Sequence, residues 1–190
     1  TATIAETLLE EVFEEVSAGS RWRDACADGA GPRVVANGLS LPVVRVDWDR
    51  VDDFFDQLFS IANGKLFANR LPKCQRRWNT RFRRLAGRID CSRRLIELSG
   101  AHYESCGSAA LGVVLLHEMI HLALHTDGLR FGHTPEFKRR SYALGMMDIR
   151  HELPLPERIV ETRTRHLYRC VCGRVIESTK RFRQPRACAA

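Results

Sequence analysis

The sequence lacks the features that mark a membrane or secreted protein. No apolar run reaches the roughly 18 residues that a membrane span requires, because Leu111–Leu124 is interrupted by His, Glu and His. A basic region followed by an apolar core, as in a secretory signal, is absent, and the first turns carry glutamates instead. We therefore expect an intracellular protein without a membrane partner.

Cysteine is present, but it lacks the pattern of a disulfide framework. The chain has seven cysteines, an odd number, and without a secretory signal we expect them to be reduced. Cys26, Cys74, Cys91 and Cys106 are scattered without metal-ligand spacing. They are expected to be mostly buried thiols.

Acidic residues are nearly missing from one stretch of this basic chain, whose formal charge is +7. Between Arg70 and Arg94 the only acidic residue is Asp90, and a second basic block runs from Arg158 to Arg186. Such blocks indicate a polyanion partner, most simply nucleic acid, although a solvated basic face explains the charge equally well. The arginines predicted to bind nucleic acid are Arg76, Arg77, Arg81, Arg83, Arg84, Arg163, Arg165, Arg181 and Arg183.

Two aromatic residues lie among these arginines. Trp78 and Phe82 could stack on unpaired bases, as in single-strand binders. For Trp78 we favour the alternative that it belongs to the core of its strand.

Periodicity predicts helices combined with a small antiparallel sheet, an α+β fold. Asp49 is predicted to cap the second helix, Ser108 the third, and Thr134 with Pro135 the last. Ser17–Gly31 reads as a linker. The predicted helices span 4–16, 50–62, 108–125 and 135–144, and the predicted strands span 41–46, 71–78, 85–90 and 95–99.

A histidine pair lies within the most apolar helix. His117-Glu118-Met119-Ile120-His121 is an H-E-x-x-H sequence, and residues four apart share one helix face, so both imidazoles can reach one Zn²⁺. Glu118 leaves the helix about 100° round from His117, where it can act as a base toward water on the metal. This is the zinc metallopeptidase arrangement.

A catalytic zinc needs a third protein ligand, and the candidates are His125, His133 and His151. His125 lies about 12 Å along the helix from His117, which suits a helix-end residue or a donor behind a ligand. We favour His133, which follows a glycine-containing loop and begins the next helix. Glu136, one turn further on, is its main competitor.

Two features of catalysis stay open at this point. The strand Leu95–Ser99 could hold substrate as an added strand. Tyr142, Tyr103 and His125 are the candidates for an oxyanion donor.

The chain resembles the SprT-like metallopeptidases, which include Spartan, a protease for DNA–protein crosslinks. The resemblance is carried by the H-E-M-I-H sequence at 117–121 and by His133-Thr134-Pro135-Glu136-Phe137, similar to the family's H-G-P-E-F. Upstream, Leu71-Pro72, Trp78, Ala86-Gly87 and Ile96-Glu97-Leu98-Ser99 resemble the family's sheet segments. Downstream, the residues from Arg165 to Cys170 resemble the start of its zinc-binding subdomain.

The resemblance implies a compact zincin-like metallopeptidase domain, His133 as third ligand, and DNA-stimulated cleavage of DNA-bound proteins in DNA repair. It divides the chain into an amino-terminal helix and linker (1–40), the SprT-like domain (41–153) and a basic, zinc-ribbon-like subdomain (154–190). A second, structural zinc there is an open question, because C-x-C is tighter than the family's usual C-x-x-C pairs. Its candidate ligands are Cys170, Cys172, Cys188 and His166.

Two other functions fit the same residues. A DNA-binding zinc module without proteolysis would not need Glu118 as a base. A peptidase of soluble proteins would make the basic face incidental, and salt-dependent DNA affinity separates it from the first function.

Overall fold

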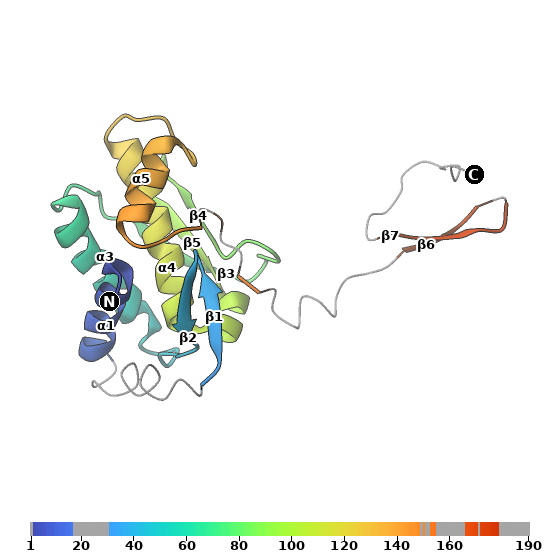
Figure 1. Ribbon diagram of the computed structural model, residues 1–190, viewed down its shortest axis with the longest axis horizontal. Coiled ribbons are helices and arrows are strands. Elements are labelled where there is room, and N and C mark those ends of the chain that lie inside the picture. Colours follow the sequence, from blue (N-terminus) through green and yellow to red (C-terminus); the bar gives the residue numbers. More distant parts are fainter. Residues whose placement is uncertain are drawn as a thin grey trace. The chain divides into compact units, whose positions relative to one another are not determined.

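The structure is a computed structural model that describes residues 2–16, 31–148, 150, 153–154, 166–170 and 172–178. The chain divides into a larger unit, Thr1–Leu155, and a smaller unit, Pro156–Ala190. Helices and small sheets are both present, so the α+β class is confirmed (Figure 1). Predictions that fall outside the described residues are those for the linker at 17–30, Cys26, His151, Arg163, Arg165, Arg181, Arg183 and Cys188.

Helix α4 (Gly100–Thr126) is the centre of the larger unit, and the other elements pack around it (Figure 1). Apart from Glu104 and Ser105, its residues are buried as far as Leu124, as expected for a helix that is apolar on all sides. Among the described residues it alone is long and apolar enough for a membrane span, and the apolar window lies wholly inside the fold. It ends at Asp127, as predicted.

The start of α4 differs from the prediction. The cap is Ser99, whose side chain accepts a hydrogen bond from the His102 amide, and the Ser108 hydroxyl accepts instead from the Val46 amide at 2.9 Å. A break at Gly107 separates the two arms of the helix, with φ 83°. Only glycine suits this position, because a Cβ would lie 2.5 Å from the Val44 carbonyl oxygen.

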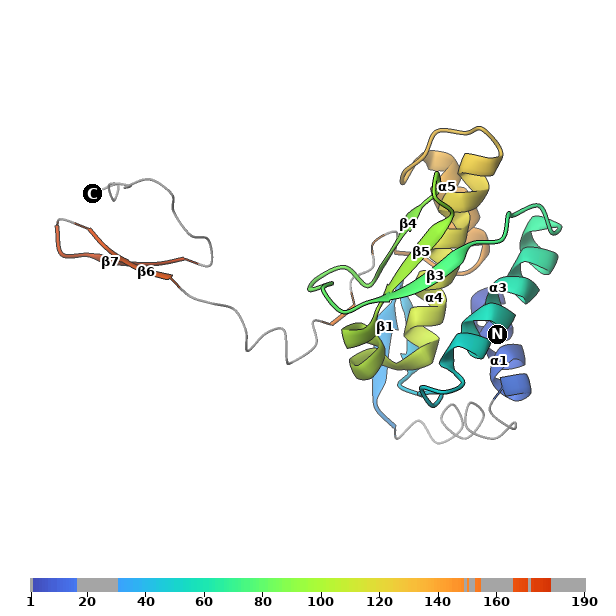
Figure 2. The same cartoon turned by 180° about the vertical axis from the view of Figure 1, so that it is seen from behind.

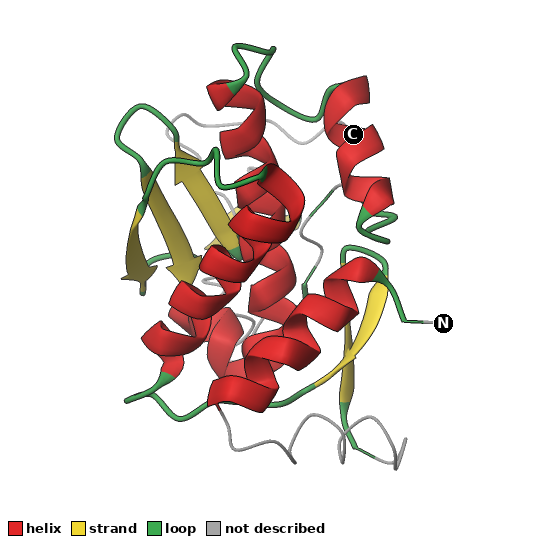
Figure 3. Ribbon diagram, turned by 90° about the vertical axis from the view of Figure 1, so that its left-hand side faces the viewer, coloured by secondary structure: helices red, strands yellow, loops and turns green. Residues whose placement is uncertain are grey.

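Helices α1 (Ile4–Val16) and α3 (Val51–Phe67) cover one side of α4 (Figure 3). The bounds of α1 are those predicted, whereas α3 runs past Asn63 and Gly64. The Asn63 side chain bonds the backbone of Leu71, and the helix ends at Ala68 in the left-handed region. The predicted Asp49 cap is wrong, since the N-cap is Arg50 and no side chain caps it.

The main sheet has the order β3-β5-β4 and stands against α4 (Figure 2). Strand β3 (Gln75–Asn79) is parallel to β5 (Leu95–Ser99), and β4 (Gly87–Asp90) is antiparallel to it. The expectation of a purely antiparallel sheet is therefore wrong. Because β5 is paired on both sides, it cannot receive substrate as an added strand, and the edge strands are β3 and β4.

A hairpin missed by the prediction precedes α3. Strands β1 (Arg33–Ala36) and β2 (Leu39–Pro42) pair antiparallel, where a single strand over 41–46 was expected. Their turn, Asn37-Gly38, has φ values of 50° and 83°, as a type I′ turn requires.

Helix α5 (Pro135–Ala143) follows the prediction, with Thr134 accepting a hydrogen bond from the Phe137 amide. Gly145 follows it with φ 86°. In the smaller unit, β6 (His166–Arg169) and β7 (Val175–Ser178) form a separate antiparallel hairpin.

Candidate metal centre

Three imidazoles from two parts of the chain converge beside α4. His117 Nε2 lies 3.2 Å from His121 Nε2 and 3.1 Å from His133 Nε2, and the ligand atoms of all three lie within 4.8 Å of one another. Tetrahedral ligands about 2.05 Å from a zinc ion lie about 3.3 Å apart. The donor set therefore fits such an ion. Among the described residues, this is the one cluster of three or more such side chains.

The three rings are held by different parts of the chain. His117 and His121 are buried on consecutive turns of α4, whereas His133 is exposed in the loop before α5. Phe137, on the first turn of α5, is fully buried and packs on all three rings. Its centroid lies 4.4 Å from that of His121, 4.7 Å from His117 and 4.8 Å from His133.

The competing third ligands are placed elsewhere. His125 is exposed on the last turn of α4 and is not in the cluster. Glu136 forms ion pairs with Arg139 and Arg140, whose hydrogen bonds lower the pKa of its carboxyl to about 2. Its carboxylate is thus committed to the arginines of its own helix.

Glu118 is buried on α4, between the two histidines in sequence. Its negative charge is one of the causes that raise the pKa of the Cys91 thiol, in the turn after β4. Burial raises the pKa of the Cys91 thiol to about 11, and Cys74, Glu118 and Asp90 add to the rise. The thiol is therefore neutral at physiological pH, and it follows β4, which packs on one side of α4.

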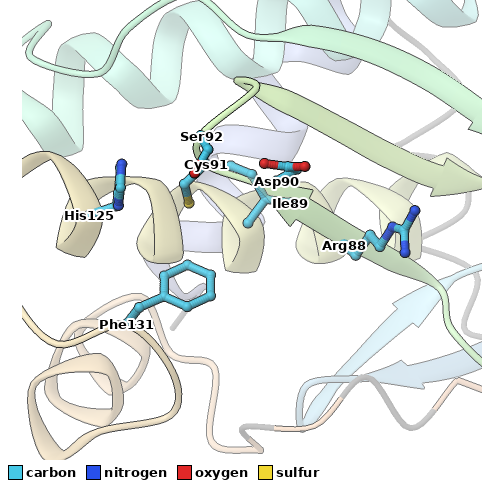
Figure 4. Close-up of a pocket in the computed structure, with 7 residues that line it drawn as sticks. All are labelled: Arg88, Ile89, Asp90, Cys91, Ser92, His125 and Phe131. Carbon is cyan, nitrogen blue, oxygen red and sulfur yellow. The ribbon is translucent and has the colours of Figure 1, made fainter.

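A cleft of about 510 Å³ lies on this side. Figure 4 shows Phe131, from the loop after α4, across from Ile89 and Cys91, with His125 at one end and Arg88 at the other. The Phe131 ring is also 5.1 Å from that of His121. Phe131 therefore lies both on the wall of this cleft and next to the histidine cluster.

Of the oxyanion candidates, Tyr103 is excluded by its position. Its buried hydroxyl donates to the Val46 carbonyl and accepts from Ser108. Tyr142 is exposed on α5 and His125 lines the cleft.

A contact that the sequence did not indicate lies behind His117. Asn37, in the β1–β2 turn, places its side-chain nitrogen 3.1 Å from His117 Nδ1. The Asn-Gly pair is a turn signal that can be recognised in the sequence. Nothing in the sequence indicated that Asn37 contacts His117, 80 residues away.

The predicted nucleic-acid residues divide into two groups. Arg76 pairs with Asp56 and Arg77 with Glu97, whereas Arg81, Arg83 and Arg84 are exposed between β3 and β4 and make no ion pair with the part of the chain that is described.

Trp78 is partly buried and packs against the core, which agrees in part with the favoured alternative. Its ring packs against Trp48, Phe55 and Tyr103. Phe82 is half-buried, with the Arg88 guanidinium 5.5 Å from its ring centre.

The cysteines also fall into two sets. Cys74, Cys91 and Cys106 form no disulfide with described residues, and burial raises the pKa of each thiol. Cys170 and Cys172 lie in the β6–β7 turn, where the Gly173 amide donates to the Cys170 carbonyl at 2.9 Å. His166 is on β6 of the same hairpin.

Comparisons with known proteins agree with the resemblance in sequence. The SprT-like family model matches residues 55–166. A protein named "Protein SprT-like" from Oceanobacillus iheyensis is 31% identical over 106 residues, which are 55% of this chain and 68% of the relative. One of the same name from Geobacillus sp. is 30% identical over 97 residues, 51% of this chain and 61% of the relative. The match covers more than half of the chain and includes all three histidines, and the chain therefore belongs to the SprT-like family.

Proposed function

We propose that this protein is a zincin-like, zinc-dependent endopeptidase that cleaves proteins bound or crosslinked to DNA. The observation that carries the proposal is the convergence of the His117, His121 and His133 Nε2 atoms beside Glu118. A structural zinc site would fill its fourth position with another protein ligand. Among the described residues, the cluster consists of three such ligands, which is the number that a catalytic zinc site uses beside its water.

Glu118 is the residue that moves the proton. When bound, a zinc ion polarises the scissile carbonyl and makes the attacking water more acidic. Glu118 accepts the proton of that water and delivers it to the leaving amine. This carboxylate is buried on α4, one residue after His117.

The substrate backbone is proposed to bind along β4. Edge strands offer backbone N–H and C=O groups to an extended peptide, and β4 is the edge that borders the cleft. Phe131 and Ile89 supply apolar contact for a substrate side chain. This assignment replaces the central strand β5.

DNA is proposed to bind at the exposed arginines between β3 and β4, namely Arg81, Arg83 and Arg84. Because they have no carboxylate partner among the described residues, their charge is available to phosphates. Arg76 and Arg77 contribute less, since each already faces a carboxylate. A protein acting on DNA would work in the bacterial cytoplasm or the eukaryotic nucleus.

The smaller unit is proposed to hold a structural zinc through Cys170, Cys172, Cys188 and His166. A hairpin turn with two cysteines is a common half of such a site. Two zinc ions per chain, falling to one in Cys172→Ser, would support it; one ion in both proteins would contradict it.

The deciding experiment compares the wild type with Glu118→Gln. The amide cannot take a proton from water at neutral pH, so the variant should keep its zinc and fold but lose cleavage of a DNA-bound protein by roughly 100-fold or more. Zinc content, circular dichroism and cleavage with and without DNA are measured on both.

Each part of the proposed function can be contradicted by a different result. Wild-type cleavage by the variant would refute the peptidase mechanism. Cleavage that ignores DNA would leave a peptidase of soluble proteins, and DNA binding without cleavage by either protein would leave a zinc-containing DNA-binding module.

A further inference from the structure

Behind His117, on the side away from the cluster, lies a buried amide. Asn37 is 2% exposed and His117 1%, and the Asn37 side-chain nitrogen lies 3.1 Å from His117 Nδ1 and 3.1 Å from the Asp148 carbonyl oxygen. The other end of the amide, Oδ1, is buried and has no hydrogen-bond partner among the described residues. A buried acceptor in this state is destabilising.

The chemistry of the ring makes this contact consequential. A neutral imidazole has one N–H and one lone pair. If Nε2 offers its lone pair to a metal, the proton is on Nδ1, and Nδ1 needs an acceptor rather than an N–H donor. The two ends of an asparagine amide exchange places by a half-turn of the side chain, so the same residue can supply either partner.

We propose that Asn37 is the positioning residue of His117: its side-chain oxygen accepts the Nδ1 proton when Nε2 binds the metal. The half-turn gives the buried Oδ1 a donor, moves Nδ2 into the place that Oδ1 leaves, and fixes both the tautomer and the direction of the ring. It gives up the bond to the Asp148 carbonyl, so metal loading is coupled to the segment after α5. The inference rests on the proposed zinc site.

The backbone holds Asn37 firmly enough for this role. Asn37 has φ 50° in a two-residue turn, a conformation that asparagine tolerates better than most residues. Its carbonyl accepts a hydrogen bond from the Asp148 amide at 3.1 Å, and Gly38 lies against Met147. The hairpin also precedes residues 55–166, which match the family model, so this support comes from outside the matched region.

The test measures zinc affinity of the full chain by competition with a chelator. Asn37→Gly removes the amide and keeps the positive φ without strain, and it should weaken zinc binding by roughly 10- to 100-fold. Asn37→Asp offers an acceptor in either orientation and should stay within a few-fold of the wild type. Ser40→Ala, in the same hairpin, removes a hydroxyl that accepts a hydrogen bond from Arg33 and should bind zinc like the wild type.

A spectroscopic readout separates positioning from general stability. In the zinc-loaded wild type and Asn37→Asp, NMR should show a slowly exchanging proton on His117 Nδ1, and Asn37→Gly should lose it. Wild-type affinity in Asn37→Gly, equal weakening in Asn37→Asp, or no protected Nδ1 proton in the loaded wild type would each overturn the inference while leaving the zinc site intact. No zinc binding by the wild type would overturn the proposed function and this inference together.

Discussion

The three clustered histidines are supplied by different parts of the chain. His133 is supplied by the loop before α5, and the nearest competing carboxylate, Glu136, is paired with Arg139 and Arg140. We predict that His133→Ala reduces zinc content strongly while α4 and α5 remain folded, because Phe137 still fills the core beneath the site. Zinc analysis after gel filtration measures this.

The matched control is Glu136→Gln, which changes the competing carboxylate and leaves the three histidines in place. It should retain a full complement of zinc. A protein that keeps its metal in His133→Ala and loses it in Glu136→Gln would show that the third ligand had been assigned to the wrong side chain.

At this scale the sequence was informative wherever chemistry depends on local spacing. The i, i+4 relation of His117 and His121 follows from helix geometry alone, and the Thr134-Pro135 start of α5 places His133 at the head of a helix. The packing of Phe137 on three rings and the contact of Asn37 with His117 could not be predicted, because both depend on which elements meet in space.

Among the elements, β5 carries a carboxylate that the neighbouring strands neutralise. Glu97 is buried, and it bonds Arg77 and Asn79 of β3 and Arg88 of β4. Burial acts to raise the pKa of Glu97, but the hydrogen bonds from Arg77, Arg88 and Asn79 outweigh it and lower the pKa from 4.5 to about 2. The three strands are thus joined by one charge as well as by backbone bonds.

The sign of the pH effect follows from the lowered pKa. Below pH 4.5 the unfolded chain binds a proton at Glu97 that the folded protein still excludes, so the free energy of unfolding falls as the pH falls toward about 2. We predict that Glu97→Gln loses about 2 kcal/mol at neutral pH and shows a flatter decline in acid. Urea unfolding across this pH range measures both.

Glu136→Gln is again a useful comparison. The pKa of Glu136 is also lowered to about 2, but the group lies at the surface, where solvent screens its ion pairs. An acid profile changed as much by Glu136→Gln as by Glu97→Gln would contradict the role given to solvent screening.

The elements that were predicted wrongly depend on contacts with other segments, which local sequence signals do not contain. Helix α3 continues through Asn63-Gly64, usually a stop signal, because the Asn63 side chain is used by the backbone of Leu71. Strands β3 and β5 are parallel because β4 pairs on the far side of β5. By contrast, α1 and α5 follow their local signals closely, since apolar periodicity and capping are properties of single segments.

At the scale of the whole molecule, the uneven charge leads to a prediction about DNA. Replacing Arg81, Arg83 and Arg84 by alanine should weaken binding to single strands of any sequence, since phosphate contacts carry no base code. The slope of log affinity against log salt should flatten by roughly 0.7 for each phosphate that the protein no longer neutralises. Binding titrations at several salt concentrations measure both effects, and cleavage of a short peptide should be little changed.

The control for net charge is the double variant Arg93→Ala with Arg94→Ala. These two arginines are exposed in the turn between β4 and β5. An equal loss there would mean that net charge, rather than the β3–β4 connection, attracts DNA. An affinity independent of salt would remove the DNA role and leave the peptidase proposal standing.

The unequal burial of the three histidines also bears on how fast a bound ion could come and go. His117 and His121 belong to a buried helix, whose amides are expected to exchange with solvent only on large-scale opening. His133 is on an exposed loop and directly follows Gly132. Displacing that loop alone would break one coordination bond and admit a competing chelator without unfolding α4. Zinc turnover should therefore proceed on the timescale of loop motion, far faster than isotope exchange at the amides of residues 117 and 121.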